Sequence, residues 1–464
     1  GNLGHANAQN NLGLIYDDAT GVLPNDVMAV HWFTKAANQN NKHAQHNLAH
    51  MYEAGEGVAR DRTEAARWYR ASARQGHSRA QYDLGRLYRA GKGVVKDYKV
   101  AHFWLSKAAA QDHTRALNSL AIMYRRGQGV KADDRKAVEL YSRAAKLGYR
   151  MAQYNLANKY LKGLGVSRDL PAAAHWYQKA ADQGHKKSRY KLARMLQYGT
   201  GIDRNIDSAI KLYTQAAEEN HLQAQISLAS IYYKGDGVDP DMAIAAKWYR
   251  RAADEGDPVA QNGLGFLYKS GQGVARDYNI ALGLFLRAVL EGNSSAQDNL
   301  GLMYLNGEGV AVDHALALKW FKAAANQDYA GGQNNLGVMY ADGLAVKRNY
   351  KKAVEWYRKA AEQNYVLAKT NLAWMYIHGK GVARDREKAR KMLLQTAAEN
   401  DPHAFLSLGE LYRDGLGVKA SFVTSDMWYT LTLEAGEQSA SEKLSWLGAK
   451  LSRSNIEQAK VMAT

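Results

Sequence analysis

The sequence predicts an all-α solenoid of twelve helix pairs, on three observations. A tyrosine returns every 36 residues from Tyr16 to Tyr412, a span of 396 residues or eleven intervals, with Leu196 in the sixth place. A Gly-x-Gly-Val segment follows it in nearly every unit, and an alanine recurs at the same interval from Ala29 to Ala389. A fixed period of this size indicates an elongated repeat array rather than two or three globular domains.

The first helix of a unit, helix A, is visible in residues 44–76. Ala44, Leu48, Met51 and Tyr52 fall at i, i+4, i+7 and i+8, which is one face of an α-helix. The glycines that follow are expected to end helix A, because glycine adopts the left-handed conformation of a helix C-terminus at little cost.

The second helix, helix B, is expected to begin at a side chain that caps its first turn. Asp61 can accept first-turn N–H groups, and Glu64 suits the reciprocal bond of a capping box. The same place holds Asp or Asn in ten other units: Asn25, Asp97, Asp133, Asp169, Asn205, Asp241, Asp277, Asp313, Asn349 and Asp385. Aromatic pairs such as Trp68-Tyr69 recur in helix B and are expected in the core, since no single unit can bury its own apolar face.

The solenoid is expected over residues 1–437 and a helical cap over 438–464. Unit 10 has Ala345 in place of a glycine, and unit 12 has Ser421 in place of the capping Asp. Beyond unit 12 the register is lost at Gly448, and Ser454 is expected to cap a last helix over 455–463. Such a terminal element would cover the apolar end of the array.

The repeated pattern, A-x-x-x-L-G-x-x-Y-x-x-G-x-G-V-x-x-D-x-x-x-A-x-x-W-Y-x-x-A-A, resembles the Sel1-like repeat. Residues 260–289 and 296–325 match it closely, and the resemblance covers about residues 6–437. It implies a right-handed α/α superhelix related to tetratricopeptide arrays, with helix A on the concave surface. It also implies a bacterial adaptor, exported or periplasmic, and some similar proteins are immunity partners of secreted antibacterial lipases.

The chain is basic and has no cysteine. Lys and Arg number 62 against 45 Asp and Glu, a formal net charge of +17. This favours acidic partners, whether protein, anionic lipid or nucleic acid, although solvated outer faces are an alternative place for the charge. The lack of cysteine excludes disulfides, thiolate catalysis and cysteine-ligated zinc. Because the sequence starts at Gly1, a removed leader fits a periplasmic or secreted protein, with the cytoplasm as the alternative.

No sequence motif indicates an enzyme, a cofactor or a metal. The Gly-x-Gly-Val segment recurs in nearly every unit and follows no expected strand, so it does not predict a phosphate loop. His43, His46 and His50 share one helical face, where they could bind a transition metal or line a polar groove. We expect neither catalysis nor a bound metal.

Variable positions on helix A predict an apolar surface in units 7 to 11. By analogy with related solenoids, the position two before the repeated tyrosine lines the inner groove. Here, and one residue after the tyrosine, the side chains are apolar, and partial burial between adjacent A helices is the alternative. The residues are Tyr233, Phe266, Leu302, Leu305, Val338, Trp374 and Ile377.

The N-terminal half predicts a basic surface instead. Residues 150–200 hold ten Lys and Arg against two Asp. We expect an electropositive groove, with a solvated basic face as the alternative. Aromatic side chains that could stack on bases are few here, which disfavours nucleic acid. The candidate residues are Arg79, Arg86, Arg115, Arg126, Lys162, Lys187 and Arg194.

Together these patterns predict a non-enzymatic scaffold that holds a protein partner in its concave groove. The partner would be acidic where it meets the N-terminal half and apolar where it meets the C-terminal half. One alternative is an immunity protein that occludes the active site of a secreted lipase-type toxin. A further alternative is a binder of nucleic acid or another anionic polymer.

Overall fold

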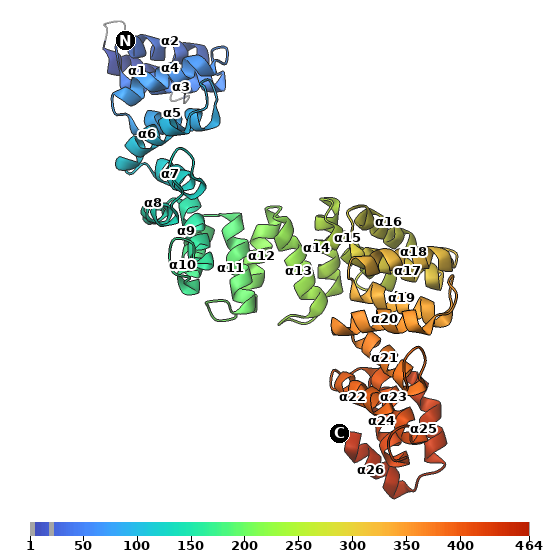
Figure 1. Cartoon of the computed structure of the whole chain (residues 1–464). Coiled ribbons are helices and arrows are strands. Elements are labelled where there is room, and N and C mark those ends of the chain that lie inside the picture. Colours follow the sequence, from blue (N-terminus) through green and yellow to red (C-terminus); the bar gives the residue numbers. More distant parts are fainter. Residues whose placement is uncertain (1–4, 18–22, 464) are drawn as a thin grey trace. The chain divides into compact units, whose positions relative to one another are not determined.

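The computed structural model describes residues 5–17 and 23–463, and the regular secondary structure within these ranges is all helical (Figure 1). Helices alternate between A and B along the chain, and each A helix packs against the B helix that follows it. Contacts divide the chain into two halves, residues 1–228 and 229–464, which are described separately. The predicted α/α solenoid is confirmed.

The A helices are 12 or 13 residues long. Their bounds are α1 Ala6–Asp17, α3 Lys42–Ala54, α5 Ser78–Ala90, α7 Thr114–Arg126, α9 Arg150–Lys162, α11 Lys186–Tyr198, α13 Leu222–Lys234, α15 Pro258–Ser270, α17 Ser294–Asn306, α19 Ala330–Asp342, α21 Val366–His378 and α23 Pro402–Asp414.

The B helices are equally short. Their bounds are α2 Asp26–Asn38, α4 Arg62–Arg74, α6 Tyr98–Ala110, α8 Asp134–Lys146, α10 Leu170–Asp182, α12 Ile206–Glu218, α14 Met242–Asp254, α16 Tyr278–Leu290, α18 His314–Asn326, α20 Tyr350–Glu362, α22 Arg386–Ala397 and α24 Phe422–Glu434.

The capping side chains of helix B act as predicted, but the capping box is wrong. Asp61 accepts bonds from the N–H groups of Thr63 and Glu64, and all ten other predicted caps accept an equivalent bond, as Ser421 does in unit 12. Glu64 pairs with Arg67 instead of reaching back. The N–H of Asp61 is already used, because it donates to the carbonyl of Tyr52 at 2.9 Å.

This bond, from the N–H of the capping residue to the carbonyl at the repeated tyrosine position, recurs in all twelve units. It uses the backbone of both residues, so the side chain at the tyrosine position does not affect it. In unit 6 the N–H of Asn205 donates to the carbonyl of Leu196 at 2.9 Å, which explains why leucine is tolerated there.

The two glycines after helix A have different roles. Gly55 is the left-handed C-cap, with φ of 86°. Gly57 lies against the preceding B helix, where an added Cβ would come within 2.2 Å of the carbonyl oxygen of Asp26. The second glycine is therefore required by the close approach of neighbouring units, and Ala345, with φ of 54°, departs from this rule.

The aromatic pairs lie in the core as predicted, but unequally. Tyr69 is fully buried, and the second aromatic of every other pair is at most 8% exposed. Most of the tryptophans are more exposed than their partners, although Trp248 is 5% exposed and Tyr249 is 8% exposed. A cation covers several tryptophans, as the Arg67 guanidinium does 4.2 Å from the Trp68 ring centroid. A buried glutamine row, which the sequence analysis missed, joins successive units. In one rung Gln75 donates to the Gln45 side chain at 2.8 Å, and Gln45 in turn donates to the carbonyl of Ala37.

Three short helices follow unit 12, namely η1 Gln438–Ala440, α25 Ser441–Gly448 and α26 Arg453–Ala463. All three pack against α24, with Ala440, Leu447 and Ala459 fully buried. The last helix begins earlier than predicted. The hydroxyl of Ser452, not Ser454, accepts the bond from the N–H of Asn455.

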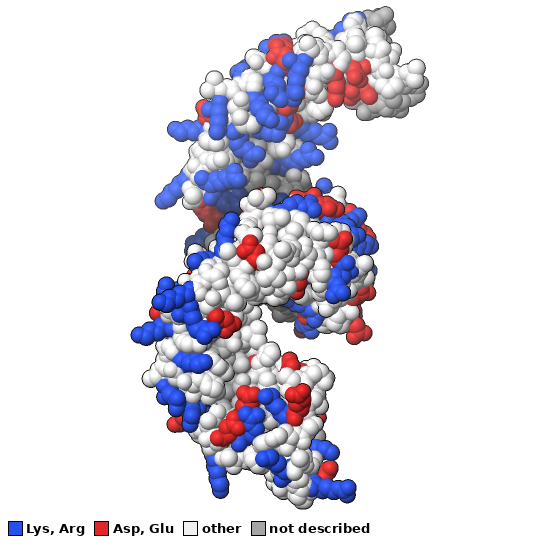
Figure 2. All heavy atoms as spheres, turned by 90° about the vertical axis from the view of Figure 1, so that its right-hand side faces the viewer, with Lys and Arg blue, Asp and Glu red and all other residues white. Residues whose placement is uncertain are grey.

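Charge is spread over the surface. Lys and Arg outnumber Asp and Glu, and the two kinds are interspersed on the visible face (Figure 2). Among the described residues, no helix combines the length and apolar character that crossing a membrane needs.

Candidate functional site

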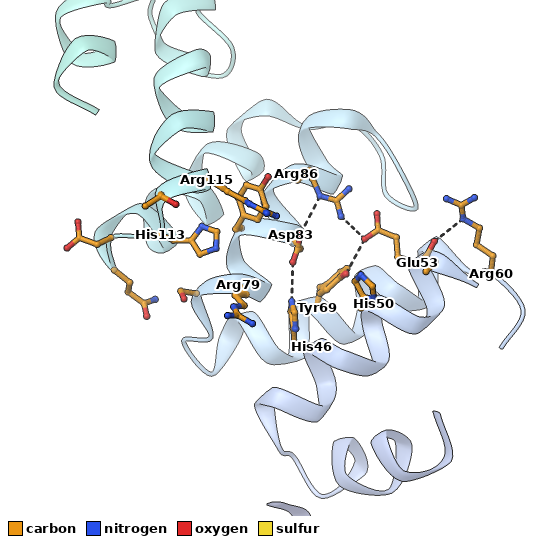
Figure 3. A pocket seen from close by; sticks show the side chains of 16 residues that line it. His46, His50, Glu53, Arg60, Tyr69, Arg79, Asp83, Arg86, His113 and Arg115 are labelled. Carbon is orange, nitrogen blue, oxygen red and sulfur yellow. Dashed lines mark hydrogen bonds and ion pairs between the residues drawn. The ribbon is translucent and has the colours of Figure 1, made fainter. Parts of the chain in front are cut away.

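Three of the predicted basic residues, Arg79, Arg86 and Arg115, line one pocket of about 1030 Å³ between α3 and α7 (Figure 3). We call it the arginine pocket. Its lining is His46, His50, Glu53, Ala54, Arg60, Tyr69, Ser78, Arg79, Tyr82, Asp83, Arg86, Gln111, Asp112, His113, Thr114 and Arg115.

The floor of the arginine pocket is a closed network of paired charges. Arg86 donates through Nη2 to Glu53 Oε2 at 2.6 Å and through Nε to Asp83 Oδ1 at 3.4 Å. The Tyr69 hydroxyl donates to Glu53 Oε2 at 3.1 Å, and burial raises the pKa of Tyr69, so it stays a neutral donor. His46 Nε2 lies 3.1 Å from Asp83 Oδ2. Figure 3 shows these side chains pointing toward one another from α3, α4 and α5.

The remaining arginines of the pocket are differently placed. Arg60 Nε donates to the backbone carbonyl of Glu53 at 2.9 Å. Arg79 and Arg115 are exposed in the first turns of α5 and α7, one repeat apart. Within the described ranges, no carboxylate forms an ion pair with any of these three, because Glu53 and Asp83 face Arg86 and Asp112 pairs with Arg143.

The three histidines predicted on one face make different polar contacts, although the rings of His43 and His46 both pack against His77. His46 faces Asp83, His50 Nδ1 lies 3.9 Å from Glu56, and the His43 ring packs edge-on against His77 with centroids 4.9 Å apart. No group of three or more potential ligands with a metal-holding arrangement occurs in the part of the chain that the structure describes.

Two further histidines are capping residues held in the neutral form. His77 Nδ1 accepts from the N–H of Ala80, and His113 Nδ1 accepts from the N–H of Ala116. Burial, aided by nearby cations, lowers the pKa of His77 to about 4, and burial also lowers the pKa of His113. Neither His77 nor His113 therefore adds positive charge to the arginine pocket at neutral pH.

In the C-terminal half, Trp374 lines a smaller pocket of about 270 Å³, which we call the tryptophan pocket. Trp374 is 39% exposed and Leu367 is 40% exposed. Lys380 lies 4.7 Å from the Trp374 ring centroid, and His378 packs against the same ring. The full lining is Asn334, Leu367, Thr370, Asn371, Trp374, His403, Leu406 and Ser407.

The other predicted apolar residues are more covered. Tyr233 and Phe266 meet edge to face with centroids 6.2 Å apart, and both are half-buried. Half-buried Leu302, Leu305 and Val338 pack against core clusters. Ile377 is 6% exposed and belongs to the core, so it offers almost no surface to a partner. For Leu302, Leu305, Val338 and Ile377, the alternative of partial burial between A helices fits better than a continuous open strip.

The remaining predicted basic residues do not join the arginine pocket. Arg194 lines a cavity of about 140 Å³ with Lys191 and Tyr177. Burial, together with the charges of Arg194 and Lys162, lowers the pKa of Lys191. Arg126, Lys162 and Lys187 are exposed on A helices.

Both named pockets use the same four places of helix A. His46 and Thr370 are equivalent in the repeat, as are Asp83 and Asn371, His50 and Trp374, and Arg79 and Leu367. The place of His50 and Trp374 is the predicted groove row. Glu53, Tyr69, Asp83 and His113 were not predicted as site residues, although a pairing interval of 37 residues, as between His46 and Asp83, was the available signal.

Solved structures resemble this chain over most of its length. A protective antigen of uropathogenic Escherichia coli strains with an SLR fold is 32% identical, with a TM-score of 0.82, covering 94% of this chain and 93% of that chain. A Sel1 repeat protein from Oxalobacter formigenes is 30% identical, with a TM-score of 0.52, covering 65% of this chain and 87% of that chain. No curated protein matches the chain in a sequence comparison.

An immunity protein from Pseudomonas aeruginosa is 22% identical, with a TM-score of 0.30, covering 54% of this chain and 81% of that chain. That likeness is too weak to support a shared function, so the immunity hypothesis stays a prediction from the sequence.

The family model described as Sel1 repeat matches almost the whole solenoid. The matched residues are 6–41, 42–77, 78–113, 114–149, 150–185, 186–221, 222–257, 258–293, 294–329, 330–365, 366–401 and 404–436. With this match and the two similar structures, the chain belongs to the Sel1 repeat family.

Proposed function

We propose that this protein is a non-enzymatic scaffold that binds a protein partner through the variable side chains of its A helices. One observation carries the proposal. The same four positions of helix A line the arginine pocket in the N-terminal half and the tryptophan pocket in the C-terminal half, with different side chains in each. Repeated residues build the core, whereas these places present charge at one site and an indole at the other.

The chemistry of the arginine pocket supports binding rather than catalysis. Sel1 repeat proteins are in general scaffolds for protein interaction. In this pocket His46 faces a carboxylate, Glu53 and Asp83 face Arg86, and Tyr69 is a buried neutral donor. A catalytic base needs a nucleophile or substrate proton within hydrogen-bond reach, and here His46, Glu53 and Asp83 are already bonded to structural partners.

The two surfaces favour different parts of a partner. The arginine pocket favours an acidic region, as the sequence analysis predicted for the N-terminal half. The tryptophan pocket favours an apolar side chain, because a half-exposed tryptophan beside an exposed leucine resembles the anchor positions that dominate binding energy.

An affinity capture from the native organism tests the proposal, using the full chain beside a Phe266→Ala/Trp374→Ala variant at two salt concentrations. We expect wild type to retain a protein at about 0.5 M salt, where surface charge is largely screened, and the variant to lose it. A matched control, Phe103→Ala/Trp446→Ala, removes the same residue types from exposed places outside the A-helix rows and is expected to retain the partner.

Other outcomes discriminate among the alternatives. Capture of a secreted lipase, with loss of lipase activity on binding, would make the protein an immunity partner. Recovery of nucleic acid or anionic polymer alone, equal for all variants and lost steeply as salt rises, would contradict the scaffold proposal in favour of polyanion binding. Thermal melts of each variant check that a lost partner does not reflect unfolding.

We further propose that the protein acts outside the cytoplasm, in the periplasm or after secretion. Its similarity to a protein described as a protective antigen of uropathogenic Escherichia coli strains supports this. The absence of cysteine is compatible with an oxidising compartment. Fractionation of the native organism tests it, and recovery only with cytoplasmic markers would contradict it.

A further inference from the structure

We infer that the arginine pocket binds an acidic peptide segment of the partner, with carboxylates held by Arg79 and Arg115. This inference rests on the proposed scaffold function and names the chemistry that one of its surfaces recognises. It is carried by the cavity, by its unpaired guanidinium groups and by the closed network beneath them.

The charges on the pocket wall are unequally paired. Two carboxylates, Glu53 and Asp83, both face Arg86, and Asp112 is bound to Arg143. Among the described residues no carboxylate pairs with Arg79 or Arg115, although both are exposed and line the cavity. Guanidinium groups bind carboxylates through two parallel hydrogen bonds, so these two arginines are suited to anionic side chains.

The repeat places these two arginines in equivalent positions. Arg79 lies in the first turn of α5 and Arg115 in the first turn of α7, exactly one repeat later in the sequence. The same place holds His43 in the unit before and Met151 in the unit after, so the pair is confined to this pocket. An extended segment with two acidic residues two positions apart presents both on one face, with their carboxylates about 7 Å apart, close to the spacing of about 8–10 Å between packed helices.

The floor of the pocket disfavours phosphate and nucleic acid. Glu53 and Asp83 lie beneath the arginines and would repel a dianionic phosphate more strongly than a single carboxylate. Tyr82, the aromatic side chain nearest Arg79 in the sequence, is stacked on His113 with centroids 4.9 Å apart and planes 27° apart. One face of the ring is therefore covered and cannot serve as a base-stacking platform.

The remaining lining is suited to a peptide. Ser78 and Thr114 offer hydroxyl groups that can bond to backbone N–H and C=O groups. Arginine stays protonated throughout the physiological pH range, so the attraction to carboxylates does not require acid pH.

A binding titration with the full chain tests the inference. The probe is a fluorescein-labelled peptide of alternating Glu and Gly, about ten residues long and extended at about 3.3 Å per residue. Its counterpart alternates Gln and Gly. We expect the Glu peptide to bind and the Gln peptide not to bind. Arg79→Gln/Arg115→Gln should weaken binding of the Glu peptide about tenfold or more, because two charge-assisted contacts are lost.

A matched control removes the same charge elsewhere. Arg74 and Lys146 are exposed at equivalent places in the last turns of α4 and α8, outside the pocket. Arg74→Gln/Lys146→Gln lowers the net charge equally and should change the affinity by less than about twofold, since screened charges outside the site act weakly. Equal losses in the two variants would overturn the inference, because attraction would then follow net charge alone.

Two further measurements distinguish the remaining outcomes. If inorganic phosphate or a single-stranded oligonucleotide displaced the Glu peptide and bound more tightly, with the same dependence on Arg79 and Arg115, the pocket would be a phosphate site and the inference wrong. If the Arg79→Gln/Arg115→Gln variant unfolded at a lower temperature than wild type, the Arg79→Lys/Arg115→Lys variant would replace it in the titration. It keeps the charge but loses the paired hydrogen bonds, so it should bind the Glu peptide more weakly than wild type. Unchanged affinity would contradict bidentate recognition.

Failure of this inference leaves the scaffold proposal separately testable. A protein partner captured equally by wild type and by the Arg79→Gln/Arg115→Gln variant, yet lost from the Phe266→Ala/Trp374→Ala variant, would reject the acidic-peptide site and retain the scaffold. Loss of all protein capture by wild type would reject the scaffold itself.

Discussion

Asp298 is a carboxylic acid at a place where neighbouring units carry an amide, and this predicts a pH-dependent gain in stability for Asp298→Asn. The Asp298 residue is 7% exposed, and its Oδ1 accepts from Asn335 Nδ2 at 2.8 Å. One repeat earlier and one repeat later the same place holds Asn262 and Asn334. These accept an equivalent bond from Asn299 and Asn371, at 3.0 Å and 2.9 Å.

The magnitude follows from the pKa of Asp298. Burial raises it from 3.8 to about 6, against the opposing effects of the Asn335 bond and the Lys269 charge. Because the folded state holds the proton more tightly than the unfolded chain, this carboxyl costs nothing well below pH 3.8. The cost grows as pH rises from about 4 to about 6 and is then constant. A shift of about two pKa units corresponds to about 3 kcal/mol.

An asparagine at 298 has no charge to bury and keeps the acceptor for Asn335. We therefore expect Asp298→Asn to raise the free energy of unfolding at pH 7.5 by up to about 3 kcal/mol. The gain should shrink as pH falls below about 6 and become small near pH 4. It should vanish only well below pH 3.8, where wild type is protonated in both the folded and the unfolded state.

Urea unfolding of wild type and variant between pH 4 and pH 8 measures this difference. Hydrogen exchange of α17 and α19 locates it, since repeat arrays open locally. The reverse substitution, Asn334→Asp, is the matched control and should destabilise the chain more at pH 7.5 than at pH 4. A pH-independent gain for Asp298→Asn, or no gain at pH 7.5, would refute the assignment of a buried, partly neutralised carboxyl.

Three further predictions concern other single places. Ala345→Gly should stabilise the chain by about 1 kcal/mol in urea unfolding, because alanine at φ of 54° is strained and glycine is not; a loss would mean that the alanine methyl packs favourably. Gln81→Ala should lower the free energy of unfolding by about 1–3 kcal/mol, because two groups that bond to Gln81 in the glutamine row lose their partner. Exposed Gln178→Ala should change the free energy of unfolding little. His46→Asn/Asp83→Asn should leave the melting temperature nearly unchanged and raise the affinity for the Glu peptide severalfold, because it removes a negative charge from the pocket floor. Equal or weaker binding would contradict the repulsion assigned to that charge.

The sequence predicted the architecture well because the period and the local chemistry agree. Each cap such as Asp61 acts within its own unit, and the left-handed glycine such as Gly55 needs no information beyond its own turn. The reciprocal bond of Glu64 was predicted wrongly for a complementary reason. A capping box considers one helix alone, whereas the N–H of Asp61 is bonded to the carbonyl of Tyr52 in the preceding helix.

The candidate site was less predictable because its partners come from different units. His43, His46 and His50 share one helical face in the sequence, yet His46 lies against Asp83 of the next unit and His50 lies near Glu56 of its own unit. The rings of His43 and His46 both contact His77. Asp83 reads as an isolated acid until the 37-residue offset to His46 is known. Burial was equally hidden, because Trp374 and Ile377 lie three residues apart and differ sharply in exposure.

The separation of core and variable places within each A helix has a functional consequence. In α5 the buried residues Ala80, Leu84 and Leu87 alternate with the pocket residues Arg79, Asp83 and Arg86 on one short helix. The bond between the cap and the tyrosine carbonyl uses backbone atoms, so it constrains none of the pocket side chains. A change at a pocket place can therefore alter charge or shape at the surface without moving the helix that carries it. On this reasoning, variants of the arginine pocket should change partner affinity far more than stability, whereas variants of the glutamine row should do the reverse.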